Sequence, residues 1–260
     1  MSGALTLLGP GAATRPLAAK GFRPFFLLAA LYAVGIVPLW LAIVGDRVAA
    51  SPYLQPASWH AHEMLFGFAT AVIAGFLLTA VANWTQRETL TGPPLLALAG
   101  LWVLGRAGFL FAEHLPRTLV ALVDLAFLPL LMGVLARPLV ATKNRRNFVM
   151  LAVLAALWLA NLAMHLEASG SALVPSGRAT GLALDAVTLL MLIIAGRVVP
   201  MFTRNATGAN DVRSLPRLDV ATAAGMAVVL VVDVVAPGTL VAKLGAGAVG
   251  LSAALRSIHW

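Results

Sequence analysis

The chain has 260 residues, of which 60% are hydrophobic and only 11% are charged. A soluble protein of this composition could not cover itself with polar side chains, so we expect the chain to lie in a lipid bilayer. The net charge is +8, but no basic run is interleaved with aromatic residues, which argues against a nucleic-acid partner. The absence of cysteine excludes disulfides and thiolate metal sites, so any metal needs His, carboxylate or Met ligands.

Apolar runs between charged residues and Pro or Gly breaks predict about eight membrane-spanning segments. Because backbone groups in hydrocarbon must bond internally, the expected fold is all-α, a polytopic transmembrane helix bundle. Residues 1–24 are expected to form a cytoplasmic N-terminal segment, and residues 25–260 the membrane domain. The predicted spans are 25–44, 62–83, 95–112, 118–136, 147–166, 181–199, 219–236 and 239–256. The last two predicted spans, 219–236 and 239–256, could instead form one helical hairpin.

The distribution of Lys and Arg predicts the orientation of the bundle. Assigning these residues to alternate sides of the spans gives an asymmetry of about twelve to four. The richer side is cytoplasmic by the positive-inside rule, and both termini then lie in the cytoplasm. Four histidines fall near the outer face, namely His60, His62, His114 and His165. Several carboxylates lie near the same face. Such a rim is suited to binding a metal ion or haem.

The segment His60–Met64 offers two imidazoles and a carboxylate where the second predicted span begins. Imidazole suits copper, iron and zinc, and a thioether adds a preference for reduced copper. Because positions i and i+2 of a helix point about 200° apart, His60 and His62 are expected to share a metal only if His60 stays in the loop. The alternative is structural: His60 or Glu63 caps the helix, and His62 bonds a neighbouring helix.

A haem needs only one or two axial side chains, supplied by helices that face each other across an apolar cavity. His62, His114 and His165 are therefore candidate axial ligands, and no spacing rule chooses among them. For His114 and His165, the alternative is that an interfacial histidine caps helix carbonyls.

Arg106 is the clearest charge inside a predicted span. A charge at that depth usually meets a carboxylate, a cavity or an anionic ligand. A haem propionate is one candidate partner, and Asp124 or Asp185 is another; snorkelling toward the outer interface is a third reading. If Arg106, Asp124 and Asp185 lined a path, the protein would instead be a transporter or channel for a metal ion or a small anion.

The segment Gly196–Asn205 closes the sixth predicted span at the inner face. Pro200 is expected to break the helix and to free carbonyls for Arg197, Thr203 or Asn205, as in the lining of a cavity. The alternative is that Arg and aromatic residues anchor the helix at the interface. The chain carries no Walker loop, dinucleotide fingerprint or Ser-His-Asp pattern in a suitable context, and whether it is an enzyme stays open.

Five groups of motifs, in this order along the chain, together resemble the NnrS family. They are Gly21–Phe26, His60–Phe68, Gly75–Ala80 with Asn83 and Trp84, Leu101 and Trp102 with Gly105 and Arg106, and Gly196–Asn205. The resemblance covers the chain from about residue 20 to residue 205 and corresponds to the N-terminal two-thirds of the family. Members of the family are longer, so a ligand supplied by their further helices is expected to be absent here.

The resemblance implies a multi-pass protein of the bacterial inner membrane that contains haem and copper and is linked to nitric oxide, nitrosative stress and denitrification. We therefore expect a membrane protein that binds or handles nitric oxide or metal-nitrosyl species. Expected metal ligands are His60, His62 and Glu63, and further expected cofactor-binding residues are His114, His165, Arg106 and Arg197. A transporter or channel, or an assembly factor for a respiratory metalloenzyme, stays open as an alternative.

Overall fold

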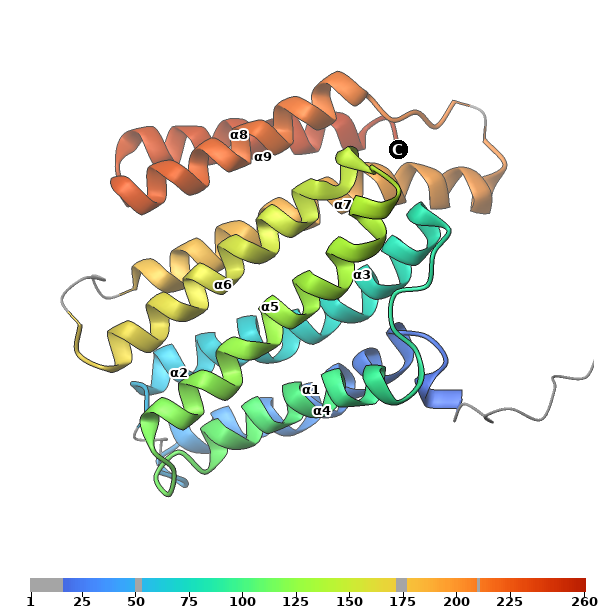
Figure 1. Ribbon diagram of the computed structural model, residues 1–260. Helices are drawn as coiled ribbons and strands as arrows, with labels where there is room; N and C mark the ends of the chain where they lie inside the picture. Colours follow the sequence, from blue (N-terminus) through green and yellow to red (C-terminus); the bar gives the residue numbers. More distant parts are fainter. Residues whose placement is uncertain (1–15, 50–52, 172–176, 210) are drawn as a thin grey trace, which may run out of the picture.

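The computed structural model describes residues 16–49, 53–171, 177–209 and 211–260, and every regular element in this part is helical (Figure 1). The all-α prediction is therefore confirmed. Residues 1–15 of the expected cytoplasmic segment lie outside the described part. The long helices are α1 (Phe22–Val44), α3 (Thr70–Thr85), α4 (Gly92–Leu110), α5 (Arg117–Ala141), α6 (Phe148–Ala168), α7 (Arg178–Thr207), α8 (Pro216–Val235) and α9 (Leu240–Ser257).

Among the described residues, seven helical segments are long and apolar enough to cross a membrane. They are α1, the continuous segment Pro56–Thr85 that ends with α3, and α4 to α8. The eighth expected span coincides with α9, which is outside this group because two cations and three glycines lower its hydropathy. Helices α8 and α9 pack along each other, as the hairpin alternative predicts.

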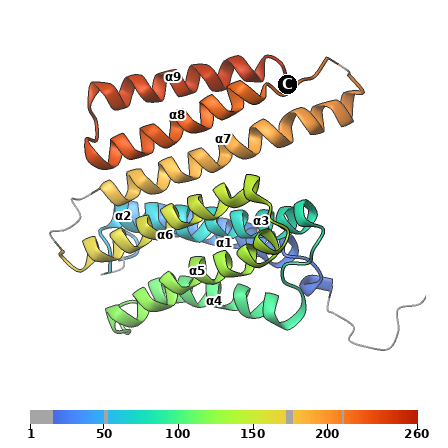
Figure 2. The ribbon, with the colours of Figure 1, turned by 45° about the horizontal axis from the view of Figure 1, so that its top comes forward.

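Helices that follow one another in the chain mostly pack side by side. Figures 1 and 2 show α8 and α9 next to α7, on the side away from α1, α4 and α5. Helix α3 is central, because it packs against both α1 and α5. The segment that contains α3 is also the most buried of the candidate spans. The chain therefore passes through the middle of the bundle soon after His60 and His62.

Four prolines lie inside helices without ending them: Pro38, Pro129, Pro138 and Pro200. The helix break expected at Pro200 is therefore wrong, since α7 continues to Thr207. Prolines are tolerated inside membrane helices because neighbouring helices and local adjustments satisfy the freed carbonyls. Pro200 is buried, and α7 is capped after Thr207 by Gly208, whose φ of +68° is left-handed.

The second candidate span is not a uniform helix. It begins with α2 (Pro56–His62), changes to a π-helical segment, η2 (Glu63–Ala69), and continues as α3. π-helical segments are rare, and they are frequent at functional sites. Here the change of hydrogen bonding begins directly after His62, so the family motif His60–Phe68 lies across the junction.

Candidate metal centre

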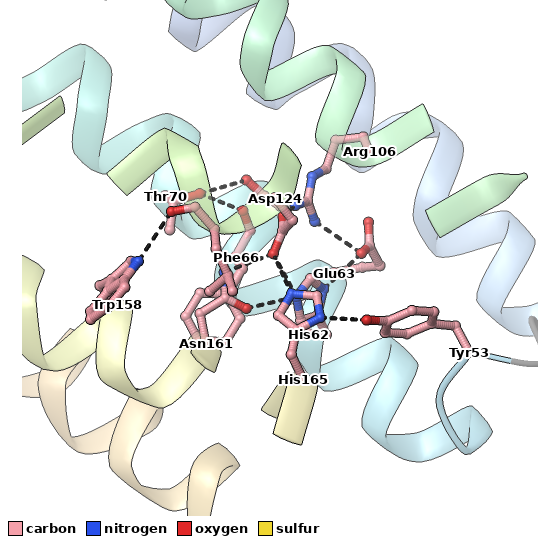
Figure 3. Close-up of polar contacts among 12 residues, drawn as sticks. Tyr53, His62, Glu63, Phe66, Thr70, Arg106, Asp124, Trp158, Asn161 and His165 are labelled. Carbon is pink, nitrogen blue, oxygen red and sulfur yellow. Dashed lines mark hydrogen bonds and ion pairs between the residues drawn. The ribbon is translucent and has the colours of Figure 1, made fainter. Parts of the chain in front are cut away.

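Three buried side chains from three helices meet near one end of the bundle (Figure 3). They are His62 from α2, Asp124 from α5 and His165 from α6, and one donor atom from each lies within 4.8 Å of the other two. Asp124 Oδ2 lies 3.0 Å from His165 Nε2 and 3.3 Å from His62 Nε2. Two imidazoles and a carboxylate at this spacing form a ligand set for one metal ion. We call this group the His-Asp-His centre.

The other nitrogen of each imidazole is held by a separate oxygen. His62 Nδ1 lies 2.9 Å from Glu63 Oε1, and His165 Nδ1 lies 2.7 Å from the hydroxyl of Tyr53. Metal-binding histidines commonly give their second nitrogen to such a partner, which fixes the tautomer and the ring orientation. When Nδ1 of each ring donates to its oxygen, both Nε2 atoms are left as metal-binding lone pairs.

Asn161 joins the His-Asp-His centre from α6. Its Nδ2 donates to Asp124 Oδ2 at 2.7 Å, and its Oδ1 lies 3.0 Å from His62 Nε2. Asn161 and His165 are four residues apart, so they lie on the same face of α6. A metal ion bound at His62 Nε2 would take the place of the Asn161 contact.

Arg106 of α4 lies between two carboxylates. Its Nη1 donates to Glu63 Oε1 at 2.9 Å, and its Nη2 donates to Asp124 Oδ1. Of the expected partners of Arg106, the structure thus shows Asp124, and it adds Glu63. With both carboxylates ionised, one guanidinium leaves one negative charge uncompensated among buried groups. Burying an uncompensated charge costs free energy, because the charge loses its hydration. A bound cation would balance this charge.

The only two tyrosines of the chain both bond to this cluster. The hydroxyl of Tyr32 on α1 donates to Glu63 Oε2, and that of Tyr53 contacts His165. Tyr53 precedes α2, and burial raises its pKa above the usual value of 10, although the nearby Arg117 acts in the opposite direction. The Tyr53 phenol is therefore neutral at physiological pH and remains a hydrogen-bonding partner for the imidazole.

Small residues let the helices approach closely around Arg106. A Cβ atom on Gly67 would lie 2.7 Å from Tyr32 Cε1 and 3.4 Å from Arg106 Nη1. A Cβ atom on Gly105 would lie 3.3 Å from Asp124 Oδ1. These glycines are thus needed for the packing that places the two ion pairs of Arg106.

The structure brings four of the predicted site residues together: His62, Glu63, Arg106 and His165. It places His60 elsewhere, stacked on Trp40 with the ring centroids 4.3 Å apart. His60 and His62 are both on helix α2, so the loop position that a shared metal would require is not seen. Glu63 supports His62 and Arg106 and is not one of the three grouped ligands.

The two remaining predicted residues lie apart from the His-Asp-His centre. His114 is exposed in the turn after α4 and pairs with Glu113 at 3.1 Å. Arg197 lies toward the opposite end of the bundle, where its Nη1 donates to Asn147 Oδ1 at 2.5 Å and its guanidinium lies over the ring of Trp84. These contacts fit the alternative that Arg197 anchors a helix end.

The sequence did not single out Tyr32, Tyr53 or Asn161, and it indicated Asp124 as a partner of Arg106 or as part of a transport path, but not as a metal ligand. Of these residues, Asn161 carries a signal in the sequence. Asn161 is a polar residue inside an apolar span, four positions before His165, and this spacing puts both on one helix face. The tyrosines carry no comparable pattern, because their contacts depend on tertiary packing.

A comparison with protein families agrees with the motifs. The NnrS family, described as NnrS protein, matches residues 16–260 of the chain. This match includes α8 and α9 and so extends beyond the residues that carry the resemblance. No curated protein and no solved structure matched the chain. Because the family match covers most of its length, the chain belongs to the NnrS family.

Proposed function

We propose that this protein binds one metal ion at the His-Asp-His centre and uses it to handle nitric oxide or metal-nitrosyl species in the inner membrane of a bacterium. The observation that carries the metal site is the convergence of His62, Asp124 and His165, buried and within 4.8 Å of one another. The family supplies the link to nitric oxide and to nitrosative stress or denitrification.

Copper is the first candidate for the ion. Imidazole nitrogens suit copper, iron, nickel and zinc, and the family resemblance implies copper. His62 and His165 would supply the nitrogen ligands and Asp124 an oxygen ligand. Glu63 and Tyr53 would orient the rings of His62 and His165 through their Nδ1 atoms, and Arg106 would orient Asp124 through its ion pair. A bound copper ion with an open coordination position would give nitric oxide a direct binding site.

A haem, which the resemblance also implies, does not fit at this centre as it is packed. The ring of Phe109 lies 4.1 Å from that of His62 and 5.7 Å from that of His165, and Phe66 lies 5.1 Å from His62. The adjoining cavity beside Arg106 and Asn161 has a volume of about 10 Å³, which is the room that a single water molecule needs. We therefore assign an ion, and no haem, to these residues.

The surroundings of the centre are suited to a small uncharged ligand. The aromatic rings beside His62 and His165 exclude water, and the centre lies within helices that a bilayer would surround. Nitric oxide is uncharged, so it partitions into lipid and reaches such a site without a polar channel. A charged substrate would have to leave its hydration shell at a cost of several kcal/mol.

The transporter alternative gains no support from the arrangement of charges. Arg106 and Asp124 are bonded to each other, whereas Asp185 on α7 interacts with Asp233 on α8. The three residues that were expected to line a path therefore do not form one described group. Asp185 belongs to a separate carboxylate pair.

Metal analysis of the purified full chain tests the proposal. Wild type, His62→Ala, His165→Ala and His114→Ala would be expressed with copper and haem precursors and analysed for both. We expect copper in the wild type and in His114→Ala, whose ring is exposed, and its loss in the other two variants. Optical spectra before and after addition of nitric oxide should change only in the proteins that retain metal. Folded wild type without any metal would contradict the proposal.

A further inference from the structure

A groove with a volume of about 450 Å³ lies at the end of the bundle opposite the His-Asp-His centre. It runs between the loop that follows α3 and the last turns of α5. One part of its lining is charged, with Arg87, Glu88 and Arg137. Another part is apolar, with Leu90, Val134 and Pro138. A polar head and an apolar tail are therefore matched by neighbouring walls of one groove.

The charge of the groove is positive. Among the described residues, neither Arg87 nor Arg137 has an ion pair or a side-chain hydrogen bond, and both are exposed. The acidic residue of the lining, Glu88, pairs with Lys20 at 2.5 Å, which compensates its charge. Two guanidinium charges are thus available to a ligand. Guanidinium binds phosphate through paired hydrogen bonds, so a phosphate group is the complementary partner.

The groove lies at the level expected for lipid headgroups. Arg87 follows the end of α3 at Thr85, and Arg137 is about one turn before the end of α5 at Ala141. Ends of spanning helices lie in the interfacial region of a bilayer. Three more cations follow α5 at the same end, namely Lys143, Arg145 and Arg146, and they add to the positive potential there.

We propose that this groove binds an anionic phospholipid, with the phosphate between Arg87 and Arg137 and the first part of an acyl chain along Leu90, Val134 and Pro138. The site is independent of the metal centre and of any reaction with nitric oxide. Its role is to hold one lipid against the loop that follows α3 and the last turns of α5. Basic pockets between membrane helices are known recognition sites for anionic headgroups.

Native mass spectrometry of the detergent-purified full chain tests the proposal. The protein is titrated with phosphatidylglycerol, with phosphatidylcholine of the same acyl chains, or with inorganic phosphate. We expect tight binding of one phosphatidylglycerol and weaker binding of phosphatidylcholine. Arg87→Gln and Arg137→Gln should each weaken phosphatidylglycerol binding by roughly five-fold, because a surface cation contributes about 1 kcal/mol to such binding.

Two control variants separate charge from structure. The double Arg-to-Lys variant at positions 87 and 137 keeps both charges and should retain most of the binding. Arg47→Gln removes an exposed arginine at the opposite end of the bundle and should leave binding unchanged. Equal binding of phosphatidylglycerol by the wild type and the double Arg-to-Gln variant would overturn the proposal. So would equal binding of the two lipids, or displacement of the lipid by inorganic phosphate, which would identify a free-phosphate site.

Discussion

His62 and His165 present their Nε2 atoms to the same carboxylate oxygen, Oδ2 of Asp124, at 3.3 and 3.0 Å. The two rings come from α2 and α6, which are far apart in the chain, and each is held at Nδ1 by a different residue. Metal affinity in such an arrangement depends on the ligands and on the residues that orient them. The two kinds of residue can be tested separately.

Replacing Tyr53 by Phe removes one orienting hydrogen bond and keeps the ring, which packs on Phe109 and His165 with centroids 5.1 and 5.6 Å away. Loss of an outer partner typically weakens metal binding by about 10- to 100-fold. We expect a decrease in this range in a competition titration with a copper chelator. Because the packing is kept, the free energy of unfolding should fall by only about 1 kcal/mol. Unchanged copper affinity would show that Tyr53 does not orient His165.

Asp124→Asn separates the metal proposal from the transport alternative. The change removes the charged ligand and one of the two carboxylates that Arg106 contacts. We expect loss of bound copper and a less stable protein. Asp185→Asn is the matched control, because Asp185 interacts with Asp233 and not with the His-Asp-His centre. Copper retained in Asp124→Asn and lost in Asp185→Asn would reverse the assignment.

Arg106 is expected to be important for stability. Arg106→Gln leaves Glu63 and Asp124 without their common guanidinium, and breaking a buried ion pair in this way costs about 3–5 kcal/mol. Arg106→Lys should lie between the wild type and the Gln variant, because an ammonium keeps the charge but lacks the planar fork that reaches two carboxylates. The free energy of unfolding in detergent measures both. Arg178→Gln, at a partly exposed arginine that donates to the backbone carbonyl of Val234, should change little.

Gly67→Ala tests the close packing around Arg106. The new methyl group would lie 2.7 Å from Cε1 of the Tyr32 ring, which packs edge-on against Trp102 and whose hydroxyl donates to Glu63. Overpacking of this kind costs about 1–3 kcal/mol and should also lower copper affinity. Gly100→Ala is the control, because the added methyl group would meet no neighbouring atom within 4 Å. This change should be neutral or slightly stabilising, since alanine favours the helix. Equal stability of the two variants would contradict this packing.

The bundle follows from the sequence because apolar length is a strong signal for membrane helices. Seven predicted spans coincide with candidate spanning helices, and the observed ends differ by a few residues, except in the second, fourth and sixth spans, where the helices are longer. The second helix begins before His60, and α7 continues through Pro200, because packing by neighbours outweighs a missing N–H group. The orientation of the bundle stays a prediction.

The centre was only partly predictable. His62, Glu63, Arg106 and His165 stand out as polar groups in apolar segments, and the structure brings them together. His60 and His114 carry the same signal, yet one stacks on Trp40 and the other is exposed. Spacing along the chain could not separate these cases, since the contact of His62 on α2 with His165 on α6 depends on tertiary packing between residues far apart in the sequence.

The most direct test of the metal proposal is the hyperfine spectrum of the copper-loaded protein, measured by electron paramagnetic resonance for the wild type, His165→Ala and the double His-to-Ala variant at positions 62 and 165. The proposed ligand set predicts coupling to two imidazole nitrogens in the wild type, to one in His165→Ala, and no such copper signal in the double variant. Two-nitrogen coupling that persists in the double variant would place the copper elsewhere and contradict the account.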